Sequence, residues 1–251
     1  MREGEEKQMD NALYVGLSRQ LTLQRALSLA ASNIANTDTV GFKVEQQMVK
    51  TEPMSPPNLN VDPINYVLDQ GIARNFGQGP LDLTGNTYDV AIDGDGFFTV
   101  QTDKGPRYTR DGRFTVNTQN KLVDKNGHSV LNASGSEITL DPNQPAPTIG
   151  EDGNISQGPG SIGKIGVVRF ASQGALQKAG GGYYQNVSNL GSQPAPDTKI
   201  EQGMIEGSNV NSITQITRLI EVSRAYEQIS SMMDQTGSLS EQSIQRLGKV
   251  N

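Results

Sequence analysis

The fold is decided by residues 208–249, whose sequence is SNVNSITQITRLIEVSRAYEQISSMMDQTGSLSEQSIQRLGK. Ser208 and Asn209 are helix-capping residue types, and Gly248 stands where a helix stop is expected. At roughly 1.5 Å per residue, a helix over these residues would be about 60 Å long. Its apolar residues form one narrow stripe, so it needs a partner helix to hold it. The stripe recurs at alternating steps of three and four, which is the spacing of a heptad seam. The seam weakens through Ser240 and Ser243 toward Leu247. Its apolar members are Leu219, Val222, Tyr226, Ile229 and Met233.

A second helical pattern covers residues 11–36 and begins after the capping residue types Asp10 and Asn11. The Ala30-Ala31 pair would allow another helix to approach closely. Residues 1–8 are charged without apolar spacing, so we expect a disordered extension there. The apolar residues of the helical pattern recur at Leu13, Leu17, Leu21, Leu23, Leu27, Ala30 and Ile34.

Composition excludes several classes of function. The chain is 34% hydrophobic and 5% aromatic with 28 Gly and 12 Pro, which indicates many turns and a modest core. A formal charge of −6 without clustered Lys and Arg argues against nucleic acid as a partner. Zero Cys excludes disulfides and thiolate metal sites. We expect no membrane span, since no stretch approaches the roughly 18 apolar residues that a span requires.

The helical pattern ends in a turn at residues 35–43. Gly41 permits positive φ, and Phe42, directly after it, is expected to anchor the chain by packing against a neighbouring molecule. Residues 46–70 show no sustained period, and their prolines rule out a long helix. A structureless loop of such length is unusual inside a compact domain, so we expect it to be functional or pinned by a neighbour.

The centre of the chain, residues 77–198, is β-rich. Short alternating runs are separated by turn pairs, which predicts an antiparallel sandwich or open barrel. Three hairpins are expected, with their turns at residues 93–96, 111–112 and 126–127, where Asp-Gly and Asn-Gly pairs stand.

Candidate chemical sites are weak. Residues 158–164 (GPGSIGK) nearly fit two phosphate-binding loops, but a strand rather than a helix follows, so a β-turn is favoured. Asp93 and Asp95 fail the calcium-loop spacing, and His128 stands alone in a predicted turn. A carboxylate-only glycosidase remains formally open. We expect no catalytic residue, no cofactor and no metal.

Five stretches resemble the flagellar rod, hook and hook-associated axial proteins of bacteria. They are residues 31–43 (ASNIANTDTVGFK), 78–98 (QGPLDLTGNTYDVAIDGDGFF), 108–112 (YTRDG) and, near the end, GSNVN with LIEVSRAYE at 207–211 and 219–227. The resemblance covers most of the chain after Met9. The opening MDNALY and the short stretch between Phe42 and Gly71 look most like the proximal rod members of the family.

The resemblance implies an α+β fold class, with long N- and C-terminal helices paired as a coiled coil (an inner tube domain) plus a central antiparallel β-rich domain. It implies a self-assembling structural rod protein, not an enzyme, that transmits torque and lines an export channel. The polar end of the long helix would face that channel. The expected division is 1–8 extension, 9–44 N-terminal helix and turn, 45–76 extended linker, 77–199 β-rich outer domain, and 200–251 C-terminal helix.

The implied partners are neighbouring copies, other rod proteins and, during secretion, the flagellar type III export apparatus, which would deliver the unfolded chain to a periplasmic rod. Alternatives are a distal rod or hook-type member of the family and, from another class, a self-contained β-rich carbohydrate-binding or hydrolytic protein. The expected assembly interface comprises Asn33, Ile34, Ala35, Asn36, Thr39, Gly41, Phe42, Ser208, Asn209, Val210, Leu219, Val222, Arg224, Tyr226, Ile229 and Met233.

Overall fold

A computed structural model describes the backbone of residues 2–54, 64–188, 191–195 and 197–248, with side chains for 14–51, 69–188, 191–195, 197–239 and 241–242. The chain forms two compact units, described separately below. Unit 1 contains residues Met1–Ala35, Glu45–Ala73 and Asn211–Asn251, whereas unit 2 contains Asn36–Val44 and Arg74–Val210. Each unit is therefore built from segments that are distant in the sequence.

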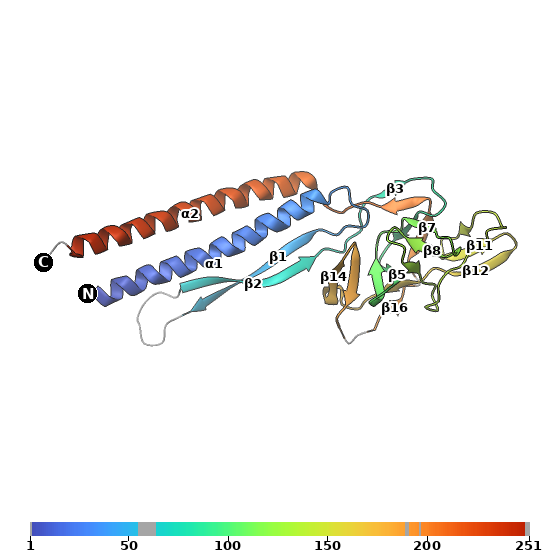
Figure 1. Ribbon diagram of the computed structural model, residues 1–251, viewed down its shortest axis with the longest axis horizontal. Helices are drawn as coiled ribbons and strands as arrows, with labels where there is room; N and C mark the ends of the chain where they lie inside the picture. Colours follow the sequence, from blue (N-terminus) through green and yellow to red (C-terminus); the bar gives the residue numbers. More distant parts are fainter. Residues whose placement is uncertain (1, 55–63, 189–190, 196, 249–251) are drawn as a thin grey trace. The chain divides into compact units, whose positions relative to one another are not determined.

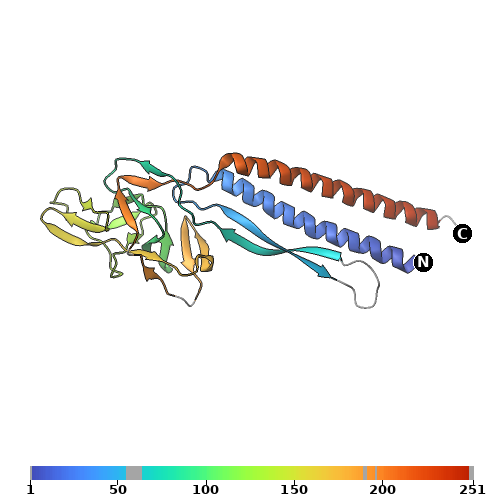
Figure 2. The same cartoon turned by 180° about the vertical axis from the view of Figure 1, so that it is seen from behind.

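Unit 1 consists of two long helices and a β-ribbon. Helix α1 spans Arg2–Ala35 and α2 spans Ser212–Gly248, and the two run side by side in opposite directions (Figures 1 and 2). Strands β1 (Glu45–Met54) and β2 (Ile64–Arg74) pair as a two-stranded sheet beside α1. Helix α1 is thus covered by two different partners.

Small and polar residues form the contact between the helices. A Cβ placed on Gly16 of α1 would lie 3.1 Å from Cγ of Met233. Further along, the side-chain amide of Gln20 donates to the Tyr226 hydroxyl at 3.1 Å. Near the opposite end, Asn33 donates to the side-chain oxygen of Gln215 at 3.1 Å. In these three contacts the residue numbers rise along α1 while those of their partners fall along α2, so the two helices are antiparallel.

The expected coiled coil is wrong, although the α+β class fits. All five apolar seam residues of α2, from Leu219 to Met233, remain half-exposed, and the one buried residue in the described part of that helix is Gln215. A coiled coil needs apolar knobs that are buried on both helices. Here α1 buries mainly Gly, Ala, Thr and Asn beside Leu23, and the β1–β2 ribbon contacts it as well.

Both helix starts differ from the expected ones. Helix α1 begins at Arg2, so the extension expected to be disordered is helical, because it is rich in the helix formers Arg, Glu, Lys and Gln. Helix α2 begins at Ser212, where the backbone N–H of Thr214 donates to the Asn211 side chain at 3.0 Å. Leu13 of the first helical pattern, and Ser240, Ser243 and Leu247 of the seam, lie outside the side chains described. The linker expected at residues 45–76 contains β1 and β2.

Unit 2 is built on an antiparallel sheet of nine strands. Seven strands follow the order β14-β15-β6-β5-β9-β8-β7, while β13 pairs with β5 and β16. The bounds of these strands are β5 Phe97–Thr102, β6 Gly105–Thr109, β7 Phe114–Val116, β8 Leu122–Asp124, β9 Ser129–Val130, β13 Val167–Arg169, β14 Leu176–Gly180, β15 Tyr183–Asn186 and β16 Gln193–Pro194.

Smaller sheets complete unit 2. Strands β10 (Thr148–Ile149), β11 (Asn154–Gln157) and β12 (Gly160–Lys164) form one three-stranded sheet. Two further sheets have two strands each and pair distant parts of the chain. In these, β3 (Leu81–Leu83) pairs with β18 (Met204–Glu206), and β4 (Val90–Asp93) pairs with β17 (Lys199–Gln202). A short 3₁₀ turn, η1, spans Gln173–Ala175.

One of the three expected hairpins is confirmed. Strands β8 and β9 pair across the Asn-Gly turn at 126–127. The hairpins expected at 93–96 and 111–112 are wrong, because β4 pairs with β17 and β7 pairs with β8. Gly112 instead allows two backbone segments to pass close together, since a Cβ on it would lie 1.7 Å from the Val90 carbonyl oxygen. The β-turn favoured within residues 158–164 is confirmed at residues 158–159, and residues 160–164 form β12.

The core of unit 2 lies against this sheet. One cluster of buried residues surrounds Phe98 and Phe114, whose rings meet edge to face at 5.1 Å. A second cluster joins the rings of Phe76, Phe97 and Tyr184 with Phe170 and Leu176. The core therefore forms within unit 2 from its own aromatic and branched side chains.

Candidate functional site

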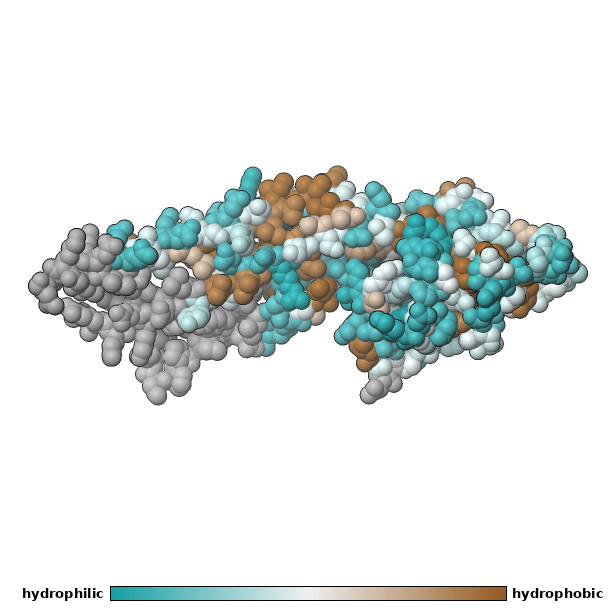
Figure 3. All heavy atoms as spheres, viewed as in Figure 1, coloured by the Kyte–Doolittle hydropathy of each residue, from teal (hydrophilic) through white to brown (hydrophobic). Residues whose placement is uncertain are grey.

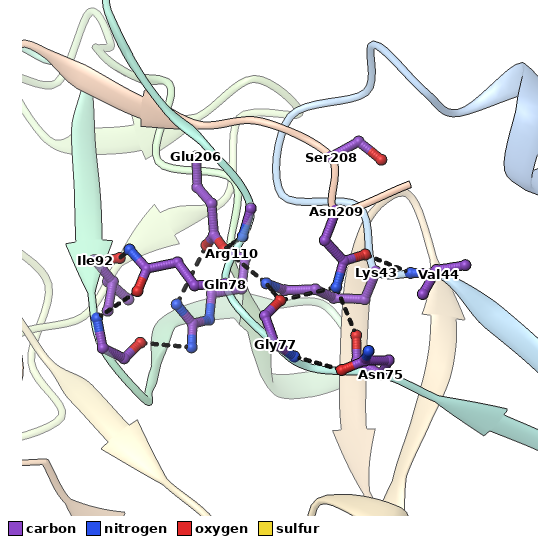
Figure 4. Close-up of polar contacts among 12 residues, drawn as sticks. Lys43, Val44, Asn75, Gly77, Gln78, Ile92, Arg110, Glu206, Ser208 and Asn209 are labelled. Atoms are coloured by element: carbon purple, nitrogen blue, oxygen red, sulfur yellow. Dashed lines mark hydrogen bonds and ion pairs between the residues drawn. The ribbon is translucent and has the colours of Figure 1, made fainter. Parts of the chain in front are cut away.

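The motifs picked out from the sequence converge within unit 2 on one buried carboxylate, that of Glu206 (Figure 4). Lys43 comes from the turn that follows α1 in the sequence, and Arg110 comes directly after β6. The backbone of Gly77 and Gly79 comes from the loop after β2. We call Lys43, Arg110 and Glu206 the buried ion cluster.

Glu206 binds both cations of the buried ion cluster. Its Oε1 accepts from Lys43 Nζ at 2.6 Å and from the backbone N–H of Gly79 at 2.9 Å. Its Oε2 accepts from Arg110 Nη1 at 3.2 Å. All three charged side chains are almost completely excluded from solvent. Removing either partner of such an interaction leaves an uncompensated buried charge, which is strongly destabilising.

The remaining donors of the two cations are largely satisfied by backbone carbonyls. Lys43 Nζ also donates to Gly77 O at 2.8 Å, and Arg110 Nη2 donates to Gly94 O at 2.9 Å. The Arg110 guanidinium lies 5.2 Å from the centre of the Phe97 ring. Arg110 Nε is the unsatisfied atom, with no hydrogen-bond partner among the described residues.

Burial controls the electrostatics of this cluster. It lowers the pKa of Lys43 below its usual value, although the attraction of Glu206 opposes that shift. Burial also lowers the pKa of Arg110, against the attraction of Glu206 and Asp95. The charges are closed off by protein atoms, so the arrangement is suited to holding chain segments together rather than to binding a substrate.

Asn209 joins two of the same segments, residues 42–44 and 75–77, beside the buried ion cluster. Its Oδ1 accepts from the backbone N–H of Val44 at 2.8 Å, and its Nδ2 donates to Asn75 O at 2.9 Å and Gly77 O at 2.8 Å. The backbone N–H of Asn209 donates to Phe42 O at 3.3 Å. Asn209 was expected to cap α2, but its side chain binds Val44, Asn75 and Gly77 instead.

Three glycines allow the same segments to approach closely. Gly41 has φ +69°, and a Cβ on it would lie 2.7 Å from the Arg110 carbonyl carbon. A Cβ on Gly79 would lie 2.2 Å from the Gly207 carbonyl oxygen. Gly112 approaches the Val90 backbone in the same way. A side chain at any of these three positions would collide with backbone atoms, which explains why each is Gly.

Phe42 is buried by its own chain. With Val44 and Val210 it forms a small apolar cluster, and Lys178 Nζ lies 4.9 Å from its ring centre. Phe42 is only 8% exposed within the single chain, and its expected packing against a neighbouring molecule stays a prediction. Ser208 is buried as well, and its hydroxyl accepts from Val210 N at 3.3 Å.

Asn33 occupies a similar joining position in unit 1. Its Nδ2 donates to Glu45 O at 2.8 Å, and its Oδ1 accepts from Glu45 N at 3.0 Å, so α1 is pinned to the first residue of β1. Of its neighbours in the expected interface, Ile34 is half-buried and Ala35 exposed. In the turn of unit 2 that follows, the Thr39 hydroxyl donates to the Asn36 side chain at 3.1 Å.

The other expected interface residues lie on α2. Leu219, Val222, Tyr226, Ile229 and Met233 share the face toward α1, and Arg224 is exposed. Sequence reasoning missed a second stripe on this helix, formed by Ile213, Ile216 and Ile220, which are 75%, 46% and 47% exposed. Their spacing of three and four was the signal that could have found it.

The sequence analysis also missed a polar network around the single histidine. The Tyr183 hydroxyl donates to Asp124 and accepts from Asn126 Nδ2 at 2.6 Å. His128 Nδ1 lies 2.9 Å from the same hydroxyl, so this ring is not the lone exposed histidine expected. Burial raises the pKa of Tyr183 above its usual range, with the Asp124 carboxylate adding to the shift.

Neither a metal cluster nor a membrane helix is found within the described part of the chain. No group of three or more His, Cys, Asp or Glu side chains there could hold a metal ion. No helix in those residues is long and apolar enough to cross a membrane.

Comparisons with known proteins match this chain to flagellar families. Residues 13–43 match the family described as "Flagella basal body rod protein", residues 91–157 match "Flagellar hook protein FlgE/F/G D1 domain", and residues 201–246 match "Flagellar basal body rod FlgEFG protein C-terminal".

Three curated relatives are similar over nearly their whole length. The flagellar basal-body rod protein FlgF of Caulobacter vibrioides is 51% identical over 245 residues, which cover 97% of this chain and 100% of the relative. FlgF of Mesorhizobium japonicum is 37% identical, covering 96% and 99%. FlgG of Bacillus subtilis is 30% identical, covering 90% and 94%.

Proposed function

Because this chain belongs to the family of flagellar basal-body rod proteins, and is thus a structural component of the rod, we propose that it self-assembles through the outer helix faces of unit 1. The proposed neighbours are further copies and other axial proteins of the flagellum. The alternative of a self-contained carbohydrate-binding or hydrolytic protein has no support in these matches. We assign no catalytic role, because the most buried charged side chains are enclosed and bind one another.

The observation that carries the proposal is the apolar surface left on unit 1. Ile213, Ile216 and Ile220 form a stripe on α2 that points away from the α1 contact, and brown apolar atoms gather over the start of this helix in Figure 3. Helix α1 carries its own exposed stripe, at Tyr14, Leu17 and Leu21. Single exposed apolar residues are normal, but stripes on both helices mark an interaction surface.

The two stripes favour a contact between different faces of successive copies. In the antiparallel register, Gly16 of α1 lies opposite Met233 and Asn33 lies opposite Gln215. The stripe at Tyr14, Leu17 and Leu21 therefore lies near the middle of α1, whereas the isoleucine stripe lies near the start of α2, opposite the end of α1. Unlike patches that bind one another between copies generate open helical assemblies rather than closed dimers.

The same arrangement suits the transmission of torque along the rod. Within unit 2, the segment that follows α1 and the segment that precedes α2 are tied together by the buried ion cluster and Asn209. Force entering the chain through either helix would thus be carried to a common anchor. The 51% identity to FlgF of Caulobacter vibrioides, against 30% to FlgG of Bacillus subtilis, supports a place in the proximal rather than the distal rod.

Export is part of this proposal. We propose that the chain reaches the periplasmic rod unfolded, through the flagellar type III apparatus, since disulfide formation is no part of its folding and the chain has zero Cys. The polar residues of α2 after Met233, among them Gln235 and Ser238, are exposed and are proposed to line the channel of the assembled rod.

A motility assay tests the assembly face. In cells that lack their own copy, we expect the triple variant I213S/I216S/I220S to abolish rod assembly and swimming. The matched control is L83S/V187S, which removes exposed apolar side chains from unit 2 and should leave swimming intact. Full motility with the triple variant would contradict the proposal, provided that the variant is secreted at the wild-type level.

A further inference from the structure

Residues 199–210, which we call the closing segment, are held outside the main sheet of unit 2. Its two strands, β17 and β18, pair with β4 and β3 in separate two-stranded sheets. The nine-stranded sheet, with its buried phenylalanines, is complete without these strands. Withdrawal of the closing segment would therefore leave the hydrogen bonds of the main sheet unbroken.

Polar contacts provide much of what holds the closing segment. Ile200 and Val210 are its buried apolar side chains, whereas Glu206 and Ser208 are buried polar ones. Gln202 accepts from Ile149 N at 3.1 Å and donates to Thr87 O at 2.8 Å and Pro147 O at 2.9 Å. A segment with few buried apolar groups opens at a lower free energy than a core strand.

The closing segment is bound to the turn at residues 36–44, which we call the turn segment. Gly41 N donates to Glu206 O at 2.7 Å, and Val44 N donates to the Asn209 side chain at 2.8 Å. If Glu206 withdrew alone, Lys43 and Arg110 would stay buried together without a carboxylate. Because that state is costly, the turn segment is expected to open when the closing segment does.

We propose that the turn segment and the closing segment form one latch, which opens as a unit while the nine-stranded sheet stays folded. The turn segment directly follows α1 in the chain, and the closing segment directly precedes α2. Opening the latch therefore frees the chain next to both helices, and Ile200 is the one described member of the main core cluster that it withdraws. The latch is a property of the single chain and holds whether or not the proposed function is correct.

Native-state hydrogen exchange on the full-length monomer tests this latch. The amides of Gly41, Gly203 and Gly207 report on its hydrogen bonds, and the amides of β5 and β6 report on the main sheet. We expect the three latch amides to exchange through one common opening, at least about tenfold faster than the sheet amides. Glu206→Gln should accelerate all three by a further factor of about a hundred and leave the sheet amides unchanged.

The control is Glu201→Gln, which removes a carboxylate from the same segment outside the buried ion cluster and should change none of these rates. Latch amides that exchange in the wild type only as fast as β5 and β6 would overturn the proposal. Different responses of Gly41 and Gly203 to Glu206→Gln would overturn it as well, and so would a variant in which the main sheet fails to fold. Motility plays no part in this test, so the latch and the proposed function fail separately.

Discussion

The two units of this chain treat their apolar side chains in opposite ways. In unit 1, the buried apolar residues with described side chains are Leu23, Ala26 and Ala30, whereas unit 2 buries the phenylalanines and most of the branched residues. Conversely, the large apolar residues found exposed belong to unit 1, apart from Leu83 and Val187. A single copy of unit 2 buries its own apolar side chains, whereas unit 1 keeps apolar surface exposed.

This difference shows how the stability and the assembly of an axial protein can depend on different parts of the chain. A folded core and a buried ion cluster hold unit 2 together without help from another molecule. Helices with small residues in contact and apolar stripes outside gain stability chiefly when neighbours cover those stripes. Stability and assembly are thereby placed in different parts of one chain, so substitutions in the two units should have different effects.

The largest expected effect on the monomer is that of Phe98→Ala. This ring is completely buried and contacts Phe114, so its removal should lower the free energy of unfolding of unit 2 by about 3–5 kcal/mol. Tyr14→Ala, which removes a ring that is 65% exposed in unit 1, is the matched control and should change it by less than about 0.5 kcal/mol. Urea denaturation measures both, and equal effects would remove the contrast between the units.

Next in size is Gly112→Ala. The new methyl group would collide with the Val90 carbonyl oxygen, so we expect a loss of about 1–3 kcal/mol or more from backbone displacement. Gly160→Ala is the control, because the nearest atom to its Cβ would be 3.9 Å away. If both variants unfolded at the wild-type urea concentration, the close crossing of these segments would not matter for stability.

Tyr183→Phe should have a smaller, pH-dependent effect of about 1 kcal/mol from its lost hydrogen bonds. The folded state raises the pKa of Tyr183, so its contribution is fully present below the usual value of 10.0 and is lost as pH rises above it. The urea midpoint of the wild type should approach that of the variant above pH 10, relative to a Tyr88→Phe control. A constant difference between the two midpoints across this range would refute the assignment.

The smallest expected effect on the monomer belongs to the isoleucine stripe. The triple variant I213S/I216S/I220S should unfold within about 0.5 kcal/mol of the wild type, because these side chains are exposed in a single copy. Thermal unfolding of the secreted chain checks this value. A large loss of stability would mean that the stripe is part of the monomer's own packing.

The sequence predicted features that depend on local spacing. The steps of three and four in α2 predicted a helix, and Asn-Gly at 126–127 predicted a hairpin. The same reasoning failed for Asp-Gly at 111–112, where the Asp111 side chain binds Arg113 and the glycine allows a backbone crossing. Spacing alone does not distinguish a turn glycine from a crossing glycine.

The site was less accessible to sequence reasoning. Asn209 and Gly41 were selected for their motifs, and the structure adds that both lie at a junction inside one chain, while their expected interface role stays a prediction. Glu206 and Arg110 were missed, because a charged residue usually lies at the surface and 96 positions separate the two. The coiled coil failed because heptad spacing does not show how deeply a stripe is buried, and this one stays half-exposed against small and polar residues of α1.

Thermal melting of the isolated monomer, followed by circular dichroism in two wavelength ranges, tests the contrast most directly. The far-ultraviolet signal reports mainly the helices of unit 1, and the phenylalanine bands of the near-ultraviolet signal report unit 2, which holds every Phe of the chain. We predict that the helical signal is lost at a clearly lower temperature than the aromatic signal. A single coincident, cooperative transition in both ranges would contradict the account, since it would show that the helices are as complete in one copy as the β unit.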